Sequence, residues 1–231
     1  MAEFLNENFY SKIYPDIERV TDREKQLAGI DLVLPDGTKV DEKCMFYPIG
    51  QKSTGVKPYN TFAFECSFKT RDKGRVTGWF LDPEKETEAY MLCWIHDCKT
   101  AKNPTKEDFL EVEVALIDRD ELYYELFVHR LSKEKIKLDS DRILEIADWD
   151  EEELTEDEIH GRFKSIGFCS KYHYKKYGQD RTNAYYVHSK QLAEEPINLI
   201  LSKDVLMSLP STKHWLVTPE TITELKKVKA A

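Results

Sequence analysis

Three charged side chains within residues 29–43 have the types and spacing of a metal-dependent hydrolytic site. Asp31 precedes a short apolar run, and Asp41 and Lys43 follow the turn sequence Pro-Asp-Gly at residues 35–37. Two neighbouring carboxylates can hold Mg²⁺ while the ion keeps several of its waters. A lysine ammonium beside them can activate a water or stabilise charge that develops on a phosphate. These residues therefore point to the hydrolysis of a phosphate ester.

The three side chains meet only if the segment folds as a β-hairpin in one particular register. Apolar runs on both sides of residues 35–37 predict two strands joined by a three-residue loop. Asp31 then stands opposite Asp41, with Cβ atoms about 4.5–5.5 Å apart. Because side chains alternate along a strand, Lys43 projects from the same face as Asp41. A two-residue turn would place Asp31 opposite Glu42 instead, and the site would not form.

An acid on one strand followed by acid-x-Lys on the next resembles the signature of the PD-(D/E)XK nuclease superfamily, which has the restriction-endonuclease-like fold. The matching residues are Asp31, Asp41 and Lys43, and the resemblance covers roughly residues 1–100. It implies that both acids bind Mg²⁺, or Mn²⁺ as a substitute, and that the lysine assists the hydrolysis of phosphodiester bonds, of DNA rather than RNA. The chain departs from the family pattern because Ile30 stands where the family has Pro, and because the Gln-x-x-x-Tyr motif of the exonuclease branch is absent.

Other acids extend or weaken this reading. Many members of the superfamily carry an acid on the helix before the hairpin, which Glu7 or Glu18 could match. Glu65, on the predicted strand after the hairpin and beside small residues, is a further candidate catalytic residue. The acid-x-Lys pattern also occurs at Asp97 and Glu224, without a partner acid across a hairpin. The alternative for the hairpin acids is an exposed polar edge whose lysine neutralises the pair.

The pattern of apolar residues predicts a mixed α and β protein, with a mixed central β-sheet flanked by helices. Strict alternation makes residues 61–68 the clearest strand. Further strands are expected at residues 76–81, 88–96, 185–188 and 197–201. Helices are expected at residues 3–13, 119–131 and 203–209. At the end of the strand over 88–96, His96 and Asp97 could form an acid–base pair, although capping a strand end is the commoner role.

The placement of charge suggests how the chain is organised. Nine acids and no Lys or Arg lie within residues 145–158, and without them the formal charge of the chain rises from −9 to zero. We therefore expect a nuclease-like α/β core over residues 1–144, an acidic linker or helix over 145–161, and a C-terminal part over 162–231 that packs on the same domain.

A basic, aromatic segment at residues 162–181 weakens the argument that an acidic protein avoids nucleic acid. It holds six basic residues among five aromatic ones, a composition that can contact phosphates and stack on bases. The nucleic-acid-binding residues expected there are Lys171, Lys175, Lys176 and Arg181. The alternative is an exposed segment that balances the neighbouring acids.

Several functional classes are excluded by what the sequence lacks. No stretch approaches 18 uninterrupted apolar residues, and the first residues have neither the basic start nor the apolar run of a signal peptide. Together with five scattered cysteines, this predicts a cytoplasmic protein with no membrane partner. A glycine-rich phosphate loop, a dinucleotide fingerprint and a serine-hydrolase elbow are absent. A homodimer, and a non-catalytic protein- or nucleic-acid-binding module on the same fold, stay open as alternatives to a lone enzyme.

Overall fold

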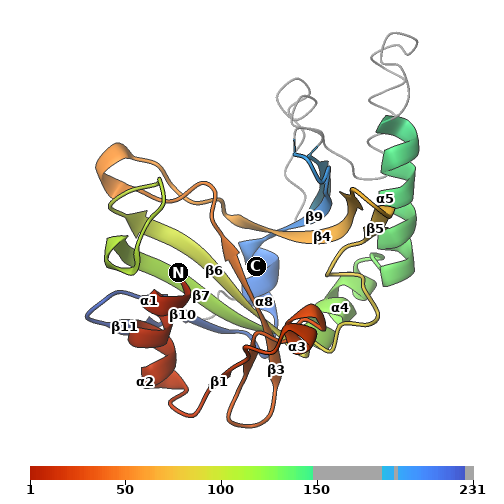
Figure 1. Ribbon diagram of the computed structural model, residues 1–231. Helices are drawn as coiled ribbons and strands as arrows, with labels where there is room; N and C mark the ends of the chain where they lie inside the picture. The colour runs from red at the N-terminus through yellow and green to blue at the C-terminus, as the bar shows by residue number, and fades with distance from the viewer. Residues whose placement is uncertain (148–183, 190–191, 227–231) are drawn as a thin grey trace. The chain divides into compact units, whose positions relative to one another are not determined.

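The computed structural model describes residues 1–147, 184–189 and 192–226, which contain both helices and strands. They form two units, each built from segments distant in sequence. The first unit comprises Met1–Asn60, Glu84–Tyr124 and Lys203–Ala231, and the second comprises Thr61–Pro83 and Glu125–Ser202. The first contains a seven-stranded mixed sheet and the second a four-stranded antiparallel sheet (Figure 1). The mixed α and β class predicted from the sequence is confirmed.

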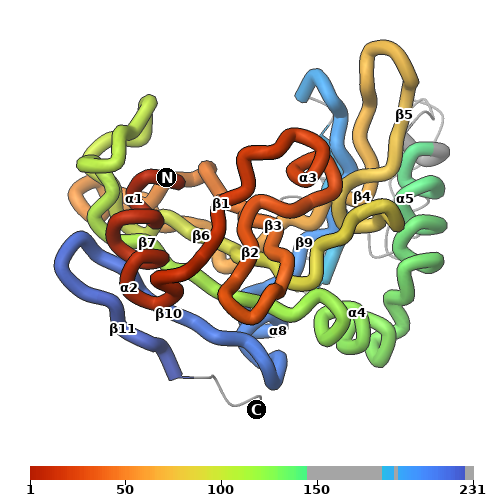
Figure 2. The backbone as a smooth tube through the Cα atoms, turned by 60° about the horizontal axis from the view of Figure 1, so that its bottom comes forward, coloured from red at the N-terminus to blue at the C-terminus, as the bar shows by residue number. Residues whose placement is uncertain are grey.

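The seven-stranded sheet has the order β1-β2-β3-β6-β7-β10-β11. Its strands are β1 (Glu18–Arg19), β2 (Leu32–Val33), β3 (Lys39–Met45), β6 (Ala89–Cys98), β7 (Phe109–Asp118), β10 (Lys213–Val217) and β11 (Ile222–Glu224). Strands β3 and β6 run parallel, and the other neighbours are antiparallel. A parallel pair needs a long crossover, and the chain between β3 and β6 supplies it by passing through the second unit. Figure 2 shows β1, β2 and β3 side by side at one edge of this sheet.

The N-terminal helical segment covers one face of the seven-stranded sheet. It consists of α1 (Ala2–Leu5), the π-helical turn η1 (Asn6–Tyr10) and α2 (Ser11–Ile13), which confirms the helix expected at residues 3–13. The buried side chains of this segment are Phe4, Leu5, Phe9 and Tyr10. They share one hydrophobic core with sheet residues that include Val40, Met91, Cys93, Val114 and Trp215. We call this side of the sheet the apolar face.

The opposite side of the sheet carries polar groups as well as apolar ones. Because side chains alternate along a strand, the residues next to those of the apolar face point the other way. The register of the paired strands puts Asp41, Tyr90, Trp94, Glu113 and His214 on this side, which we call the polar face. Both clusters of charged residues described below lie on it.

The remaining helices of the first unit are short. They are α3 (Arg23–Leu27), the 3-10 turns η2 (Lys52–Thr54) and η3 (Lys106–Asp108), and α8 (Lys203–Ser208). Helix α4 (Arg119–Val128) begins in the first unit and ends in the second. The side chain of Asp22 caps α3 by accepting a hydrogen bond from the Lys25 N–H at 2.9 Å, the common way to satisfy a free N–H group at a helix start. The helices expected at residues 119–131 and 203–209 are thus confirmed.

The second unit packs helix α5 (Lys133–Ala147) against a sheet of order β5-β4-β9-β8. Its strands are β4 (Thr61–Thr70), β5 (Gly74–Thr77), β8 (Ala184–His188) and β9 (Ile197–Ser202). Buried Ser67 on β4 and Ser140 on α5 are joined by a hydrogen bond of 3.0 Å between their hydroxyls. The Tyr186 hydroxyl on β8 donates to Asp139 on α5 at 3.3 Å. These bonds satisfy polar groups that the helix buries against the sheet.

The predicted strands are confirmed at residues 61–68, 88–96, 185–188 and 197–201, but the strand expected at 76–81 ends early. Strand β5 stops at Thr77, because the chain turns at Gly78 to pack closely against β4. The Gly78 N–H donates to the Cys66 carbonyl at 2.8 Å, and a Cβ on Gly78 would stand 2.4 Å from the Glu65 carbonyl oxygen. A side chain there would prevent this approach.

The predicted boundaries at residues 144 and 161 lie around the acidic stretch. Helix α5 reaches its first residues, and the rest of that stretch and the basic segment 162–181 lie outside the described residues. The division into 1–144, 145–161 and 162–231 therefore stays a prediction, while contacts among the described residues divide the chain into the interleaved units. None of the helices in the described part of the chain has the length and apolar character needed to cross a membrane.

Gly50 marks a close approach between the segment after β3 and strand β6. Its N–H donates to the Ile95 carbonyl at 2.9 Å, and a Cβ would stand 2.2 Å from the His96 carbonyl oxygen. We expect Gly50→Ala to lower the free energy of unfolding by on the order of 2 kcal/mol, because the clash is with backbone. Exposed Ser53→Ala should change it by less than about 0.5 kcal/mol. Urea denaturation checks both, and equal stability of the two variants would contradict the close approach.

Candidate active site

The hairpin of β2 and β3 has the register that the sequence predicts. The Leu34 N–H donates to the Thr38 carbonyl at 3.0 Å, which closes a three-residue loop over residues 35–37. The pairing of β2 with β3 then continues back along both strands and sets Asp31 opposite Asp41. The alternative register, with Asp31 opposite Glu42, does not occur.

Local chemistry of the loop explains this register. Gly37 has φ of +90°, a backbone conformation that a side chain disfavours. The Asp36 carboxylate accepts a hydrogen bond from the Thr38 N–H at 3.0 Å, a turn-stabilising contact typical of Asp. Three consecutive residues of the sequence Pro-Asp-Gly thus set the length of the loop, and the loop length sets which residues face each other.

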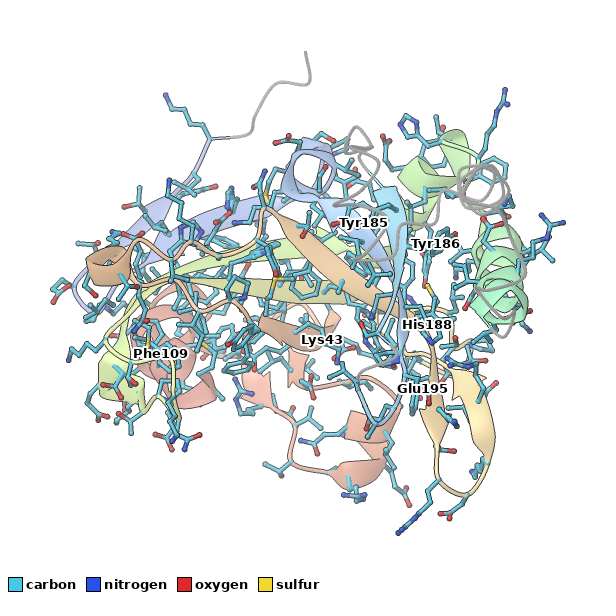
Figure 3. The ribbon with its side chains drawn as sticks, turned by 90° about the horizontal axis from the view of Figure 1, so that it is seen from above. Lys43, Phe109, Tyr185, Tyr186, His188 and Glu195 are labelled. Carbon is cyan, nitrogen blue, oxygen red and sulfur yellow. The ribbon has the colours of Figure 1, made fainter. Side chains whose placement is uncertain are left out.

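Asp31, Asp41 and Lys43 come together on the polar face. The Lys43 ammonium donates to Asp41 Oδ1 at 2.5 Å. The side chain of Asp41 is 3% exposed and that of Lys43 is 30% exposed, so the cluster is open on the lysine side. Asp31 Oδ2 accepts a hydrogen bond from the Glu42 N–H at 2.9 Å, which holds the carboxyl of Asp31 against β3. Lys43 is labelled in Figure 3.

The electrostatics of Asp41 are unfavourable for a carboxylate. Burial raises the pKa of Asp41 to about 6 against the attraction of Lys43, and the neighbouring carboxyl of Asp31 adds to the rise. The buried ring of Tyr90, which is paired with Asp41 in the sheet, lies beside it on the same face. The ionised form of Asp41 is therefore disfavoured in this setting.

A divalent cation would relieve this repulsion, and the donor set fits one. Carboxylate oxygens are the ligands that Mg²⁺ and Mn²⁺ favour, and Mg²⁺ commonly binds through one or two carboxylates while keeping several waters. Asp31 and Asp41 would hold the ion. Across the described ranges, no cluster of three or more His, Cys, Asp or Glu side chains is arranged to hold a metal ion. A metal ion at this pair would have two protein carboxylates and water as its ligands.

Contacts on the apolar face hold β3 in this orientation. The Tyr10 hydroxyl donates to Glu42 Oε1 at 2.6 Å, and Arg19 donates to Glu42 Oε2 at 3.1 Å. Because Glu42 alternates with Asp41 and Lys43, these bonds on one side keep the two candidate catalytic residues on the other.

The other predicted site residues are not among the residues that contact this cluster in the first unit. Glu65 lies on β4 of the second unit, and its catalytic role stays a prediction. Glu7 is ion-paired with Lys106 and belongs to the helical segment on the apolar face. Glu18 is exposed on β1 and pairs with Val33 of β2. The four expected nucleic-acid-binding residues, Lys171, Lys175, Lys176 and Arg181, lie outside the described residues.

The second acid-x-Lys sequence, at Asp97 and Lys99, does not bring its acid and its lysine together. Asp97 accepts a hydrogen bond from the Lys52 N–H at 2.9 Å, while Lys99 donates to the Glu107 carbonyl at 2.6 Å. The two side chains thus bind separate partners, in contrast to Asp41 and Lys43. They provide a matched control for the site.

Sequence reasoning missed a second charged cluster on the polar face, centred on buried Glu113 of β7. Its Oε1 lies 2.6 Å from Nε2 of His214 on β10, and its Oε2 contacts both Nε2 of His96 on β6 and the ammonium of Lys203. The Lys203 ammonium also lies 4.5 Å from the centre of the Trp94 ring, a cation–π contact.

Glu113 is stabilised as a carboxylate by these partners. Burial alone would raise its pKa, but hydrogen bonds from His214 and His96 and the charge of Lys203 outweigh burial and hold the pKa well below its usual range. The sequence signal was a pair of glutamates, Glu111 and Glu113, inside the apolar run of residues 109–118, together with His96 at the end of β6. The pairing of β7 with β10 and the position of Lys203 depend on contacts between distant segments, which a local sequence pattern does not predict.

Comparison of the chain with protein-family models, curated proteins and solved structures found no match.

Asp41 should make the protein less stable as pH rises from about 4 to about 6. Its folded pKa lies above its unfolded value of 3.8, so the folded state binds the proton more tightly, and ionisation costs folding free energy. In EDTA at pH 7.5 we expect Asp41→Asn to be more stable than the wild type by on the order of 3 kcal/mol at most, and to lack this pH trend. Urea denaturation between pH 4 and 8 measures both. If the free energy of unfolding changes with pH in the same way in the wild type and in Asp41→Asn, the raised pKa is contradicted.

Glu113, in contrast, should make the protein less stable as pH falls. Its folded pKa is depressed, so its contribution is fully present above its unfolded value of 4.5 and is lost as pH falls. We expect Glu113→Gln to lower the free energy of unfolding at pH 7 by on the order of 3 kcal/mol, because three donors lose a buried partner. The difference from wild type should shrink below pH 4. Glu111→Gln, on the same strand and more exposed, is the control, and equal losses in the two variants would contradict a special role for Glu113.

Proposed function

We propose that this chain is a Mg²⁺-dependent nuclease that hydrolyses phosphodiester bonds, with DNA as the preferred substrate. The observation that carries the proposal is the juxtaposition of Asp31 and Asp41 across the hairpin, with Lys43 on the same face. The resemblance of these residues to the PD-(D/E)XK signature supports the same reading. DNA rather than RNA follows from that resemblance alone.

Each residue of the cluster has a distinct part in this mechanism. Asp31 and Asp41 would hold the metal ion, which when bound polarises a phosphate oxygen and lowers the pKa of a bound water. Lys43 would orient the attacking water or stabilise the negative charge that develops on the phosphate. Its ammonium is positioned by Asp41, and its partial exposure leaves it reachable from solvent. Glu42, bound by Tyr10 and Arg19, keeps the strand in register.

A non-catalytic binding module on the same fold is the second candidate. One observation favours it: Lys43 already forms an ion pair with Asp41, as expected for an acid that a lysine simply neutralises. The two candidates differ in metal affinity. A nuclease site should bind Mn²⁺ in a way that Asp31→Asn abolishes, whereas a binding module should be indifferent to the metal.

We further infer a cytoplasmic location. Four cysteines in the described part of the chain, Cys44, Cys66, Cys93 and Cys98, are thiols rather than disulfides. Free cysteines are typical of reducing compartments, and this supports the inference together with the composition.

Cleavage of DNA by matched variants tests the proposed function. With Mg²⁺ and with plasmid or single-stranded DNA, we expect Asp31→Asn, Asp41→Asn and Lys43→Met to lose activity by on the order of 10²-fold or more, because each removes a group that holds the metal ion or acts on the reacting phosphate. Asp97→Asn and Lys99→Met should cleave as the wild type does. Loss of activity in these controls to the same degree, or a wild type inactive on both substrates, would overturn the proposal.

A further inference from the structure

The segment that follows β3 exposes aromatic side chains. Over residues 46–60, which we call the aromatic loop, Tyr47 is 80% exposed, Tyr59 is 59% exposed and Phe46 is 49% exposed. Burying such rings is normally favourable, so exposed aromatic side chains are candidates for contact with a ligand. In Figure 1 the loop is the orange segment beyond β3.

The loop is anchored at its base. Ile49 is buried in the core of the first unit, and Gly50 is hydrogen-bonded to β6. Gln51 pairs with Val56 across the loop, and its side-chain amide donates to the Cys98 carbonyl at 3.3 Å. The exposed rings are thus held on a folded support, which lowers the entropy lost when a ligand binds.

The charge of the loop itself favours an anionic ligand, although Asp97 and Glu111 contact it at Lys52. Residues 43–64 contain no Asp or Glu, although the whole chain carries a formal charge of −9. They contain Lys43, Lys52 and Lys57. Lys52 is ion-paired with Glu111 and Lys43 with Asp41, so exposed Lys57 is the better candidate to meet a phosphate. An acid-free stretch with exposed rings in an acidic protein fits a polyanion that also offers flat apolar surfaces.

The loop is close to the candidate active site along the chain. Phe46 follows Lys43 by three residues, so their Cα atoms lie within about 10 Å of each other. A nucleic-acid strand bound on the loop would therefore have phosphates within reach of Lys43.

We propose that the aromatic loop binds unpaired bases of a single-stranded nucleic acid, which stack on Tyr47 and Tyr59 while Lys57 contacts the backbone. Bases within a duplex already stack on each other and do not present their faces, so single strands or unpaired ends are the matching ligand. This inference rests on the proposed function, because it specifies the substrate class of the same site. It concerns residues different from those expected in the basic segment 162–181.

Fluorescence anisotropy with the full chain tests this proposal. The probes are a labelled 15-nucleotide single strand and the duplex of the same sequence, in EDTA so that no cleavage occurs. We expect tighter binding of the single strand, and a loss of about 5-fold to 100-fold in affinity for Tyr47→Ala and Tyr59→Ala. Tyr47→Phe should bind as the wild type does, because stacking needs the ring and not the hydroxyl. Tyr124→Ala, which removes a tyrosine 68% exposed on α4, is the matched control.

The salt dependence of binding tests the role of Lys57. Lys57→Ala should reduce the slope of log affinity against log salt concentration by about 0.7, the value for one phosphate contact on a single strand. An unchanged slope would overturn that part of the proposal.

The outcomes separate the loop from the catalytic proposal. Three outcomes would each overturn the loop's role and favour a protein partner for the exposed rings. The first is equal affinity for the single strand in Tyr47→Ala, Tyr59→Ala and Tyr124→Ala. The others are duplex binding as tight as single-strand binding, and no binding by the wild type. Tyrosine-dependent binding without cleavage in Mg²⁺ would support the loop's role and refute the nuclease. Cleavage that does not depend on the two tyrosines would support the nuclease and refute the loop's role.

Discussion

The length of the loop between β2 and β3 is the constraint on which the candidate site depends. Side chains alternate every second residue, so a loop one residue shorter would bring Glu42 opposite Asp31. The observed three-residue loop sets Asp41 and Lys43 on the polar face and leaves Val40 for the hydrophobic core under the N-terminal helical segment. The same choice of register therefore builds the core on one side of β3 and the site on the other.

Glu42 shows how the apolar face supports the polar one. An acid on a face that packs against a helix would be costly without partners, but Tyr10 and Arg19 bind it on both carboxylate oxygens. A slip of β3 would break these bonds and expose Val40, so packing and hydrogen bonding favour the same register. This agreement keeps Asp41 buried even though its ionised form is disfavoured there.

Prediction from the sequence succeeded where local chemistry decides the structure. The Pro-Asp-Gly turn, with its left-handed Gly37, specifies the hairpin and thus the facing of Asp31 and Asp41. It failed where distant segments decide. Glu113 gains its partners from β6 and from the C-terminal elements α8 and β10, which are about 90 residues further along the chain than β7. The early end of β5 likewise depends on how closely Gly78 approaches β4, a contact that the strand pattern of residues 76–81 does not encode.

Asp41 and Glu113, the two buried acids of the polar face, differ in how their negative charge is balanced. The difference indicates which carboxylate lacks sufficient positive charge around it. Glu113 has three donors on its two oxygens, and its pKa is depressed, so its ionisation stabilises the fold. Asp41 is bound by Lys43, but burial and, to a smaller degree, the carboxyl of Asp31 raise its pKa, so its ionisation costs stability. A buried acid whose ionisation costs stability is a candidate to bind a further positive charge. On this argument a cation would act at Asp31 and Asp41, whereas the Glu113 cluster joins β6, β7, β10 and α8.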